Sequence, residues 1–301
     1  MTAPLSIAPR RGAPGHRSRR RVARAALAAI LVLLLLLAAG WLLWDNRRLD
    51  VTGYDVTVAS LPASSEGLRI VQISDLHAAD FGTFQDRVLA DTGAARPDLI
   101  VLTGDLIDHR TADLSGVLEL AARLASIAPT YLVLGNHEAD SPRQDELLAG
   151  LEDHGVGVLR DEAVQVRIAG FDLTLIGLDD PRVRAAAGLP SRDPSSLRAS
   201  LAPPDEEPTI LLAHRPELFA SYTGAGIDLV LSGHAHGGQV RLPIVGGLYA
   251  PHQGWLPELS EGVHERGDTT MMISRGLGNS IAGVRVNDPR ELVVVELHSA
   301  E

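Results

Sequence analysis

The chain has 301 residues, of which 45% are hydrophobic but only 4% aromatic, so it can form one large domain with an aliphatic core. It contains no cysteine and all 27 of its basic residues are arginine, which excludes disulfides, thiolate metal sites, a cysteine nucleophile and lysine-based catalysis. Residues 1–48 carry nine arginines and one acid, whereas residues 49–301 carry 18 arginines and 37 acids. Because nucleic-acid binding requires a basic surface, this acidic part argues against a nucleic-acid scaffold as partner.

Residues 25–44 form an uncharged, leucine-rich run that we predict to be a transmembrane anchor. Twenty residues in a helix rise about 30 Å, which is roughly the thickness of a bilayer's hydrocarbon core. Trp41 and Trp44 at the far end suit the membrane interface. Seven arginines precede the run, so residues 1–24 are expected to form a basic cytoplasmic tail. The prediction is a single-pass membrane protein whose carboxyl-terminal domain is extracytoplasmic.

A cleaved signal peptide is the alternative interpretation of the same segment. Ala38 and Gly40 are small residues of the kind found at cleavage sites, and residues 18–24 resemble a twin-arginine export signal. Residues 41–44 remain apolar beyond the small residues, which favours the uncleaved anchor.

Beyond the anchor, residues 45–66 are predicted to be a linker with a first edge strand, and residues 67–301 a single domain of the α/β class. In the linker, Tyr54, Val56 and Val58 alternate as in a strand. Short apolar runs then predict further strands at residues 70–73, 99–102, 131–134, 164–168, 173–176, 210–212, 229–231, 271–274 and 292–297. Helical spacing is found at residues 114–127 and 145–154, and the polar excursion at residues 182–208 contains a short helix near residues 195–201.

Polar residues of the types that commonly bind metals follow five of the predicted strands. They are Asp75 and His77, Asp105 and Asp108, Asn136 and His137, His214, and finally His234 and His236. Ligands of α/β sheets gather beyond the carboxyl ends of strands. Buried together without a cation, so many carboxylates, amides and imidazoles would carry a large desolvation cost. The pattern therefore predicts a site for two divalent cations.

These spacings resemble those of the calcineurin-like metallophosphoesterase superfamily. The matching blocks are Asp75-Leu76-His77, Gly104-Asp105-Leu106-Ile107-Asp108, Gly135-Asn136-His137-Glu138, His214 and Gly233-His234-Ala235-His236. The resemblance covers about residues 68–240, with the blocks in the family's order. It implies a four-layer α/β/β/α sandwich, here preceded by one transmembrane helix.

The resemblance also implies a role for each of these residues. The first metal would be bound by Asp75, His77, Asp105 and His236, and the second by Asp105, Asn136, His214 and His234, so that Asp105 bridges the two ions. His137 would bind no metal and would donate to the phosphoryl or leaving oxygen. Asp108 would orient His137 through a hydrogen bond.

The chemistry of the residues agrees with these roles. Two cations about 3.5–4 Å apart lower the pKa of a bridging water enough to give a nucleophilic hydroxide near neutral pH. An alkoxide leaving group needs a proton or a positive field, which His137 would supply. Nitrogen and oxygen ligands without thiolate suit Mn, Fe or Zn, and the resemblance favours Mn²⁺.

Further residues resemble a membrane-anchored bacterial phosphodiesterase branch, related to enzymes that hydrolyse UDP-2,3-diacylglucosamine in lipid A biosynthesis. They lie at residues 237–243, 246–251 and 274–279. Arg275 and Arg241 in these segments are candidate substrate-binding residues, because arginine can bind phosphate through two parallel hydrogen bonds. The predicted function is a phosphodiesterase or pyrophosphatase that acts near a membrane on lipid-linked, nucleotide-sugar or other envelope phosphates.

Two other functions remain as alternatives. The first is a phosphomonoesterase or protein phosphatase of the same superfamily, with which Glu138 is shared. The second, from a different class, is an inactive surface binding module stabilised by metals. A missing ligand or a missing His137 would indicate such a module, and the sequence lacks neither.

Overall fold

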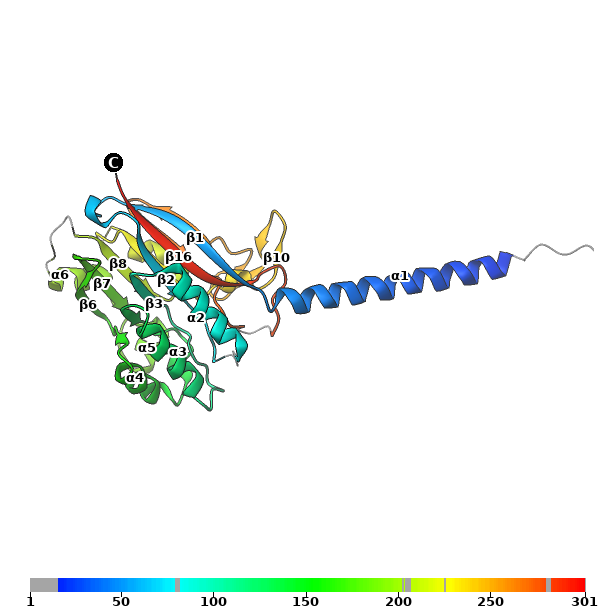
Figure 1. Cartoon of the computed structure of the whole chain (residues 1–301), viewed down its shortest axis with the longest axis horizontal. Coiled ribbons are helices and arrows are strands. Elements are labelled where there is room, and N and C mark those ends of the chain that lie inside the picture. The colour runs from blue at the N-terminus through cyan, green and yellow to red at the C-terminus, as the bar shows by residue number, and fades with distance from the viewer. Residues whose placement is uncertain are drawn as a thin grey trace, which may run out of the picture. The chain divides into compact units, whose positions relative to one another are not determined.

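The computed structural model describes residues 16–78, 82–201, 203, 207–224, 226–279 and 283–300. The chain consists of a helical unit that ends at Trp44 and a compact unit that begins at Asp45. Helix α1 (His16–Asp45) forms the first unit (Figure 1). Its segment Arg20–Asp45 is long and apolar enough to cross a membrane, and its apolar window is not buried by protein.

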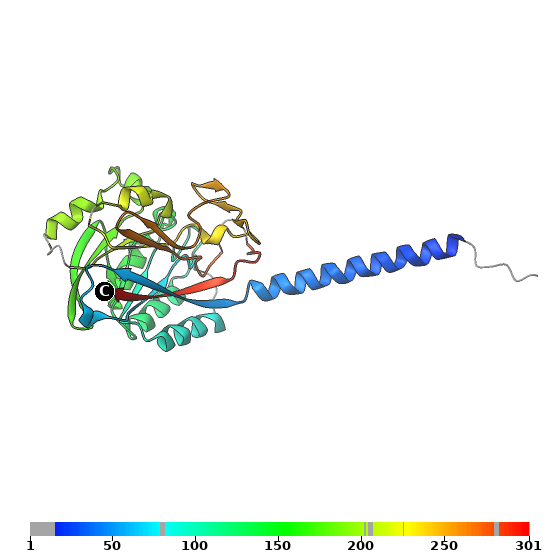
Figure 2. The same cartoon turned by 90° about the horizontal axis from the view of Figure 1, so that it is seen from above.

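In the described part of the compact unit, two six-stranded sheets carry the fold (Figures 1 and 2). The first has the order β1 (Leu49–Val58), β16 (Arg290–Ser299), β2 (Leu68–Ile73), β3 (Leu99–Leu102), β4 (Thr130–Leu132) and β5 (Gly157–Val158). The second has the order β14 (Gly262–Arg266), β15 (Thr269–Ile273), β9 (Leu229–Ser232), β8 (Thr209–Ala213), β7 (Phe171–Leu178) and β6 (Glu162–Ile168). Two short hairpins are formed by β10 (Arg241–Leu242) with β11 (Gly246–Gly247) and by β12 (Tyr249–Ala250) with β13 (Gly254–Trp255).

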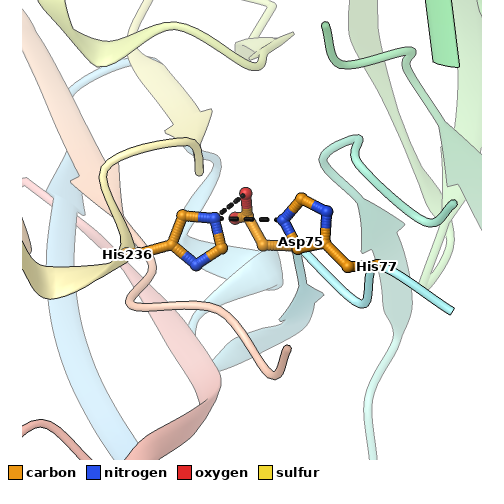
Figure 3. Close-up of side chains that lie close together, drawn as sticks. All are labelled: Asp75, His77 and His236. Carbon is orange, nitrogen blue, oxygen red and sulfur yellow. Dashed lines mark hydrogen bonds and ion pairs between the residues drawn. The ribbon is translucent and has the colours of Figure 1, made fainter. Parts of the chain in front are cut away.

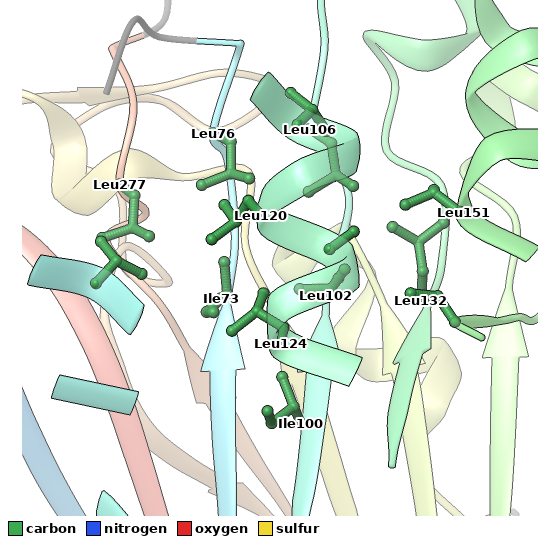
Figure 4. Close-up of a cluster of buried hydrophobic side chains, with 14 of the residues drawn as sticks. Ile73, Leu76, Ile100, Leu102, Leu106, Leu120, Leu124, Leu132, Leu151 and Leu277 are labelled. Carbon is green, nitrogen blue, oxygen red and sulfur yellow. The ribbon is translucent and has the colours of Figure 1, made fainter. Parts of the chain in front are cut away.

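Helices cover the outer face of each sheet. Those that pack on the first sheet are α2 (Thr83–Ala95), α3 (Ser115–Ala125) and α4 (Gln144–Asp153), and their apolar cluster is drawn in Figure 4. Those that pack on the second are α6 (Pro194–Leu201) and α7 (Phe219–Tyr222). Helix α5 (Pro181–Ala186) and four short 3₁₀ turns, at Ala63–Ser65, Glu138–Asp140, Pro216–Leu218 and His236–Gly238, lie in the connections. The predicted α/β/β/α sandwich is confirmed.

The central strands are buried on both faces, which is why they read as continuous apolar runs. In β3, Leu99 and Val101 contact the second sheet, whereas Ile100 and Leu102 contact the helices. Successive side chains of a strand point to opposite faces, so a single run contributes to two core layers.

Several elements differ from the prediction. β4 ends at Leu132, two residues before the predicted end, because the chain turns there toward the site. Helix α2 and the hairpins β10–β13 were not predicted, since α2 buries only Val88, Leu89 and Thr92 and the hairpins have two-residue strands. β1 is longer than expected and pairs along its whole length with β16.

Candidate metal centre

The predicted ligands lie directly beyond the carboxyl ends of strands from both sheets. Asp75 follows β2, Asp105 follows β3 and Asn136 follows β4, while His214 follows β8 and His234 follows β9. β2, β3 and β4 run parallel to one another, as do β7, β8 and β9. The loops of the two sheets therefore meet in one place.

The backbone of these loops is unusual. Five predicted ligands have positive φ angles: Asp75 (55°), His77 (49°), Asp105 (55°), His234 (67°) and His236 (49°). Such conformations are uncommon outside glycine and cost about 1–3 kcal/mol each, so the surrounding structure must impose them.

Two glycines of the motifs allow the loops to approach one another closely. A Cβ atom at Gly135 would lie 2.2 Å from Asp105 Oδ1, and one at Gly233 would lie 2.4 Å from Asp75 Oδ2. Any side chain at either position would displace a carboxylate of the centre. This packing explains the glycine that precedes Asn136 and the one that precedes His234.

One group of side chains consists of Asp75, His77 and His236 (Figure 3). His77 Nε2 lies 3.1 Å from His236 Nε2, and His236 Nε2 lies 3.3 Å from Asp75 Oδ1. Burial raises the pKa of the Asp75 carboxyl to about 6 and lowers the pKa of His77 to about 4. All three side chains thus converge with atoms that bind cations.

A second group consists of Asp105, His214 and His234. Asp105 Oδ2 lies 3.0 Å from His214 Nε2 and 4.0 Å from His77 Nε2, so this oxygen lies between the two groups. Burial alone would lower the pKa of His214, but the neighbouring Asp105 carboxylate raises it to about 10. The buried carboxylate therefore draws a positive charge to this point.

Buried atoms without partners show that this centre fits cations. His214 Nδ1 lies 2.7 Å from the carbonyl oxygen of Thr103 and must donate to it, so in the neutral ring Nε2 carries a lone pair that faces Asp105. Asp105 Oδ2, His214 Nε2 and Asn136 Oδ1 are all buried and lack a hydrogen-bond partner. Asp105 Oδ2 and His214 Nε2 face each other, and two such acceptors are costly unless a proton or a metal ion lies between them; the raised pKa of His214 reflects the same attraction for a positive charge. The donor set of carboxylate, amide and imidazole suits divalent metals.

His137 lies at the edge of both groups. Its backbone N–H donates to Asp105 Oδ1 at 2.8 Å, and its ring meets that of His77 edge-on with centroids 4.7 Å apart. Its Nδ1 atom is buried without a hydrogen-bond partner. The ring is also close enough to His77 and Asp105 to join a metal site with them.

The predicted hydrogen bond between Asp108 and His137 is wrong for this structure. Asp108 Oδ1 instead accepts from the backbone N–H of Arg110 at 2.7 Å and lies 3.3 Å from Thr111 Oγ1. A short acidic side chain that can reach its own backbone two residues on forms such a turn readily. Asp108 therefore stabilises the loop after β3 from within.

The structure does not support Arg275 and Arg241 as substrate-binding residues. The Arg275 guanidinium lies 3.1 Å from Glu291 and is also close to Glu261 and Asp50. Arg241 forms an ion pair with Glu261 and donates to the carbonyl oxygen of Gly237. Both charges are neutralised by carboxylates that lie far away in the sequence.

Two residues near the centre were not predicted from the sequence. Arg285 is fully buried, lies 3.2 Å from Asp288 and 3.2 Å from His236 Nδ1, and so places a positive charge behind one ligand. His252 lies between β12 and β13, where its Nδ1 is 2.8 Å from Arg215 Nη1 and 3.0 Å from His234 Nε2. No motif marks either residue.

The contact with His252 fixes the tautomer of His234. Arginine can only donate, so His252 Nδ1 accepts from Arg215. A hydrogen on the neighbouring Nε2 of His234 then avoids two lone pairs facing each other at 3.0 Å, although the lone pair of His252 Nδ1 is shared with Arg215. This leaves Nδ1 of His234 with a free lone pair, as a metal ligand requires.

A cavity of about 520 Å³ lies beside the second group of ligands. Its walls include His214, Arg215, Asp180, Arg192, Leu178 and Tyr222. Arg215 is held by Asp180, to which it donates from both Nε and Nη2. The cavity thus combines apolar walls with arginine side chains next to the predicted ligands.

Comparison with known proteins identifies related chains. The family profile described as "Calcineurin-like phosphoesterase" matches residues 68–238. The "Uncharacterized metallophosphoesterase YkuE" of Bacillus subtilis is 29% identical over 83% of this chain and 86% of its own. The "Phosphodiesterase YaeI" of Escherichia coli is 30% identical over 76% of this chain and 82% of its own. A "Transmembrane protein with metallophosphoesterase domain" from Bos taurus is 33% identical over 63% of this chain and 45% of its own.

Proposed function

The chain belongs to the calcineurin-like phosphoesterase family and is a phosphoric ester hydrolase, and we propose that it is a membrane-anchored phosphodiesterase that acts on lipid-linked or other envelope phosphodiesters. The observation that carries the proposal is the position of Asp105 Oδ2, which is buried, lacks a hydrogen-bond partner and lies between two groups of ligands. A carboxylate in that position can bind two cations at once.

In this proposal Asp75, His77, Asp105 and His236 bind one divalent metal, and Asp105, Asn136, His214 and His234 bind the other. When bound, the two metals lower the pKa of a shared water and neutralise the phosphoryl oxygens. We favour Mn²⁺ over Fe or Zn on the strength of the family resemblance.

The chain's own residues then complete the site. His137, whose side chain reaches the edge of both groups, donates a hydrogen bond or proton to the leaving oxygen. Thr103, through its carbonyl oxygen, holds the His214 ring so that Nε2 faces Asp105. His252 likewise orients the His234 ring, through its contact with Nε2 of that ring. About half of the His252 side chain is exposed, so in this proposal it lies where a substrate would enter.

Two observations support a substrate at a membrane. Helix α1 is long and apolar enough to span a bilayer, and its last residues lead directly into the compact unit. Tethering an enzyme to a surface raises its effective concentration toward substrates on that surface. A UDP-2,3-diacylglucosamine-like molecule, with both a lipid and a nucleotide-sugar diphosphate, is one such substrate. The arginine cluster before α1 supports a cytoplasmic amino terminus and an extracytoplasmic site, which a reporter fused to the carboxyl terminus would test.

The experiment is a comparison of bis-p-nitrophenyl phosphate, a diester, with p-nitrophenyl phosphate, a monoester. The full-length protein is stripped of metal with a chelator and then reloaded with Mn²⁺, Fe²⁺ or Zn²⁺. We expect hydrolysis of the diester to exceed that of the monoester, to disappear without metal and to return best with Mn²⁺. The control is Asp105→Asn, which should bind less metal at both positions and lose activity. A preference for the monoester would instead favour a phosphomonoesterase, and metal binding without hydrolysis of either ester would favour an inactive module.

A further inference from the structure

Two hairpins beside the metal centre carry a cluster of exposed apolar side chains that the proposed hydrolysis does not use. We call this cluster the hairpin surface. It consists of Leu242, Ile244, Val245, Tyr249, Trp255 and Leu256. Ile244 is completely exposed and Trp255 is 76% exposed. Exposed apolar side chains that are grouped together indicate an interaction site, whereas single exposed apolar side chains are common on any protein.

The sequence of this region is as unusual as its exposure. Residues 242–256 contain no Asp, Glu or Arg, although 22% of the chain is charged. Exposed hairpin strands that face only water are expected to carry charged side chains, which keep the protein soluble and prevent association. The absence of charge from residues 242–256 indicates an apolar or interfacial surrounding.

The hairpins are joined into one platform. The backbone N–H of Leu248 donates to Val240 at 2.8 Å, and that of Leu256 donates to Leu248 at 2.9 Å. The rings of Tyr249 and Trp255 meet edge-on with centroids 5.7 Å apart. The exposed side chains are therefore held together before any partner arrives.

One end of this platform reaches the metal centre. In the β12–β13 hairpin, Tyr249 pairs with Trp255 and Ala250 with Gly254, so His252 lies at the turn. His252 contacts His234 there, while Tyr249 and Trp255 lie at the open end of the same hairpin. A molecule held at the hairpin surface would thus have a short path to the site.

The platform also lies close to the residue at which the anchor helix enters the compact unit. Asn46 exchanges two hydrogen bonds with the backbone of Arg285, both 2.7 Å long. The next residue, Val286, pairs with Val240 at the base of β10 and accepts from the N–H of Arg241. In both views the β10 hairpin lies at the same end of the compact unit as the start of β1 (Figures 1 and 2). Because Trp44 is only two residues from Asn46, this holds whatever direction the helix takes.

We propose that the hairpin surface inserts into the interfacial layer of the same bilayer that holds α1, and that it delivers lipid-borne phosphodiesters to the metal centre. Tryptophan and tyrosine favour that layer, and aliphatic side chains beside them gain from burial in it. The part of the proposal that concerns membrane insertion rests on α1 as an anchor. The part that concerns substrate delivery rests on the proposed function. A second copy of the chain is the competing occupant, but it would not account for the proximity of the surface to the end of α1.

The first experiment measures depth and does not depend on activity. Because the chain has no cysteine, Ile244→Cys introduces a single thiol for a polarity-sensitive fluorophore. The full-length protein is reconstituted into phosphatidylethanolamine–phosphatidylglycerol vesicles, with and without doxyl-labelled lipid. The matched control is Asp172→Cys, an exposed position beside the turn of the β6–β7 hairpin. This turn lies at the end of the second sheet where β7 and β8 begin, whereas the metal centre lies at the end where β8 and β9 finish.

We expect the doxyl lipid to quench the label at position 244 and to leave the label at position 172 bright. Equal quenching at both positions, or none at 244, would overturn the proposal. A label at 244 that is shielded in lipid-free detergent, in a protein that elutes as a dimer, would also overturn it in favour of a second copy.

The second experiment measures delivery of substrate. Ile244→Asp is compared with Ile127→Asp, a partly exposed isoleucine between α3 and β4, at the end of β4 opposite the one that Asn136 follows. For each variant the rate on a phosphodiester lipid in vesicles is divided by the rate on soluble bis-p-nitrophenyl phosphate. This ratio should fall about tenfold for Ile244→Asp, because the burial free energy of one isoleucine corresponds to at least that factor. It should stay near the wild-type value for Ile127→Asp.

The two experiments separate the two premises. An unchanged ratio for Ile244→Asp, with quenching at 244, would show a docked surface that does not deliver substrate and would overturn the part of the proposal that concerns substrate delivery. A wild-type protein that hydrolyses neither ester would refute the proposed function, while the quenching result would still decide the docking.

Discussion

Glu138 Oε2 accepts a hydrogen bond from the backbone N–H of Asp105 at 2.9 Å. The same carboxylate accepts from the N–H groups of Leu106 at 2.6 Å, Ile107 at 3.1 Å and Gly135 at 2.8 Å. One fully buried acid thus fastens the loop after β3 to the loop after β4. Glu138 has a structural role here, so its identity does not distinguish a phosphodiesterase from a protein phosphatase.

Glu138→Gln should destabilise the compact unit and loosen the site. A glutamine has one oxygen acceptor, and its NH₂ group would face N–H donors that lose their partner. Buried groups without a partner cost about 1–3 kcal/mol each, so we expect the free energy of unfolding to fall by an amount of that order. Urea unfolding of the full-length protein in detergent measures it. The control is Glu146→Gln, which removes only an exposed ion pair with Arg143 and should cost less than about 1 kcal/mol. An equal loss of unfolding free energy in both variants would mean that the hydrogen bonds of Glu138 do not hold the two loops together.

His137→Ala should retain both metals and lose turnover. We assign His137 to the leaving group, and general acid catalysis is typically worth about 10²–10⁴-fold. The loss should be larger for an alkyl phosphodiester than for bis-p-nitrophenyl phosphate, because the alkoxide is the poorer leaving group. Metal content by mass spectrometry and rates on both esters are the measurements. A variant that binds one metal fewer would make His137 a ligand with His77 and Asp105.

Asp108→Asn should have little effect on catalysis. The asparagine oxygen can still accept from the N–H of Arg110, which preserves the turn. Because Asp108 forms no hydrogen bond to His137 here, the alkaline limb of the pH–rate profile should stay in place. A limb that moves to lower pH would show that the Asp108 charge raises the pKa of the catalytic acid after all.

His298 should stabilise the carboxyl-terminal strand in a pH-dependent manner. Its Nδ1 lies 2.6 Å from Glu66 Oε1, and its hydrogen bonds to Glu66 and Asp55 raise its pKa above 6.5. A raised histidine pKa contributes stability that is complete below the unfolded pKa and is lost as pH rises through the folded one. The partner Glu66 has its pKa lowered to about 2, chiefly by the backbone N–H of Ser299, so its contribution is lost only as pH falls toward that value.

The test is the melting temperature of His298→Gln against the wild type. The difference should be present at about pH 5.5 and should shrink by about pH 9, where the histidine is neutral in both states. The control is His154→Gln, an exposed histidine with no ion pair in the described part of the chain. A difference that does not change with pH would assign His298 a packing role alone.

The strand-end residues were the part of the site that sequence could predict. Apolar runs that are buried on both faces indicate parallel strands. Because the carboxyl ends of parallel strands lie at the same edge of a sheet, polar residues that follow these strands lie close together. The structure accordingly brings Asp75, His77 and His236 together, and Asp105, His214 and His234.

Contacts that depend on the path of a loop could not be predicted. Asp108 bonds within its own turn because that partner is two residues away and His137 is not. Arg275 is neutralised by Glu291 and Glu261, which only the folded sheet brings near. His252 reaches His234 because a hairpin of two-residue strands turns at that point, and strands so short leave no periodic pattern.

The ten residue pairs that join β1 to β16 bear on how the protein is made. β16 lies between β1 and β2, so the first sheet has a gap until residues 290–299 leave the ribosome. By then the rest of the compact unit has been synthesised, and the apolar flanks of β1 and β2 stay uncovered until β16 arrives. We expect such a chain to need chaperones during that interval, and a fusion or truncation that delays β16 should be cleared by proteases before it can assemble a metal centre.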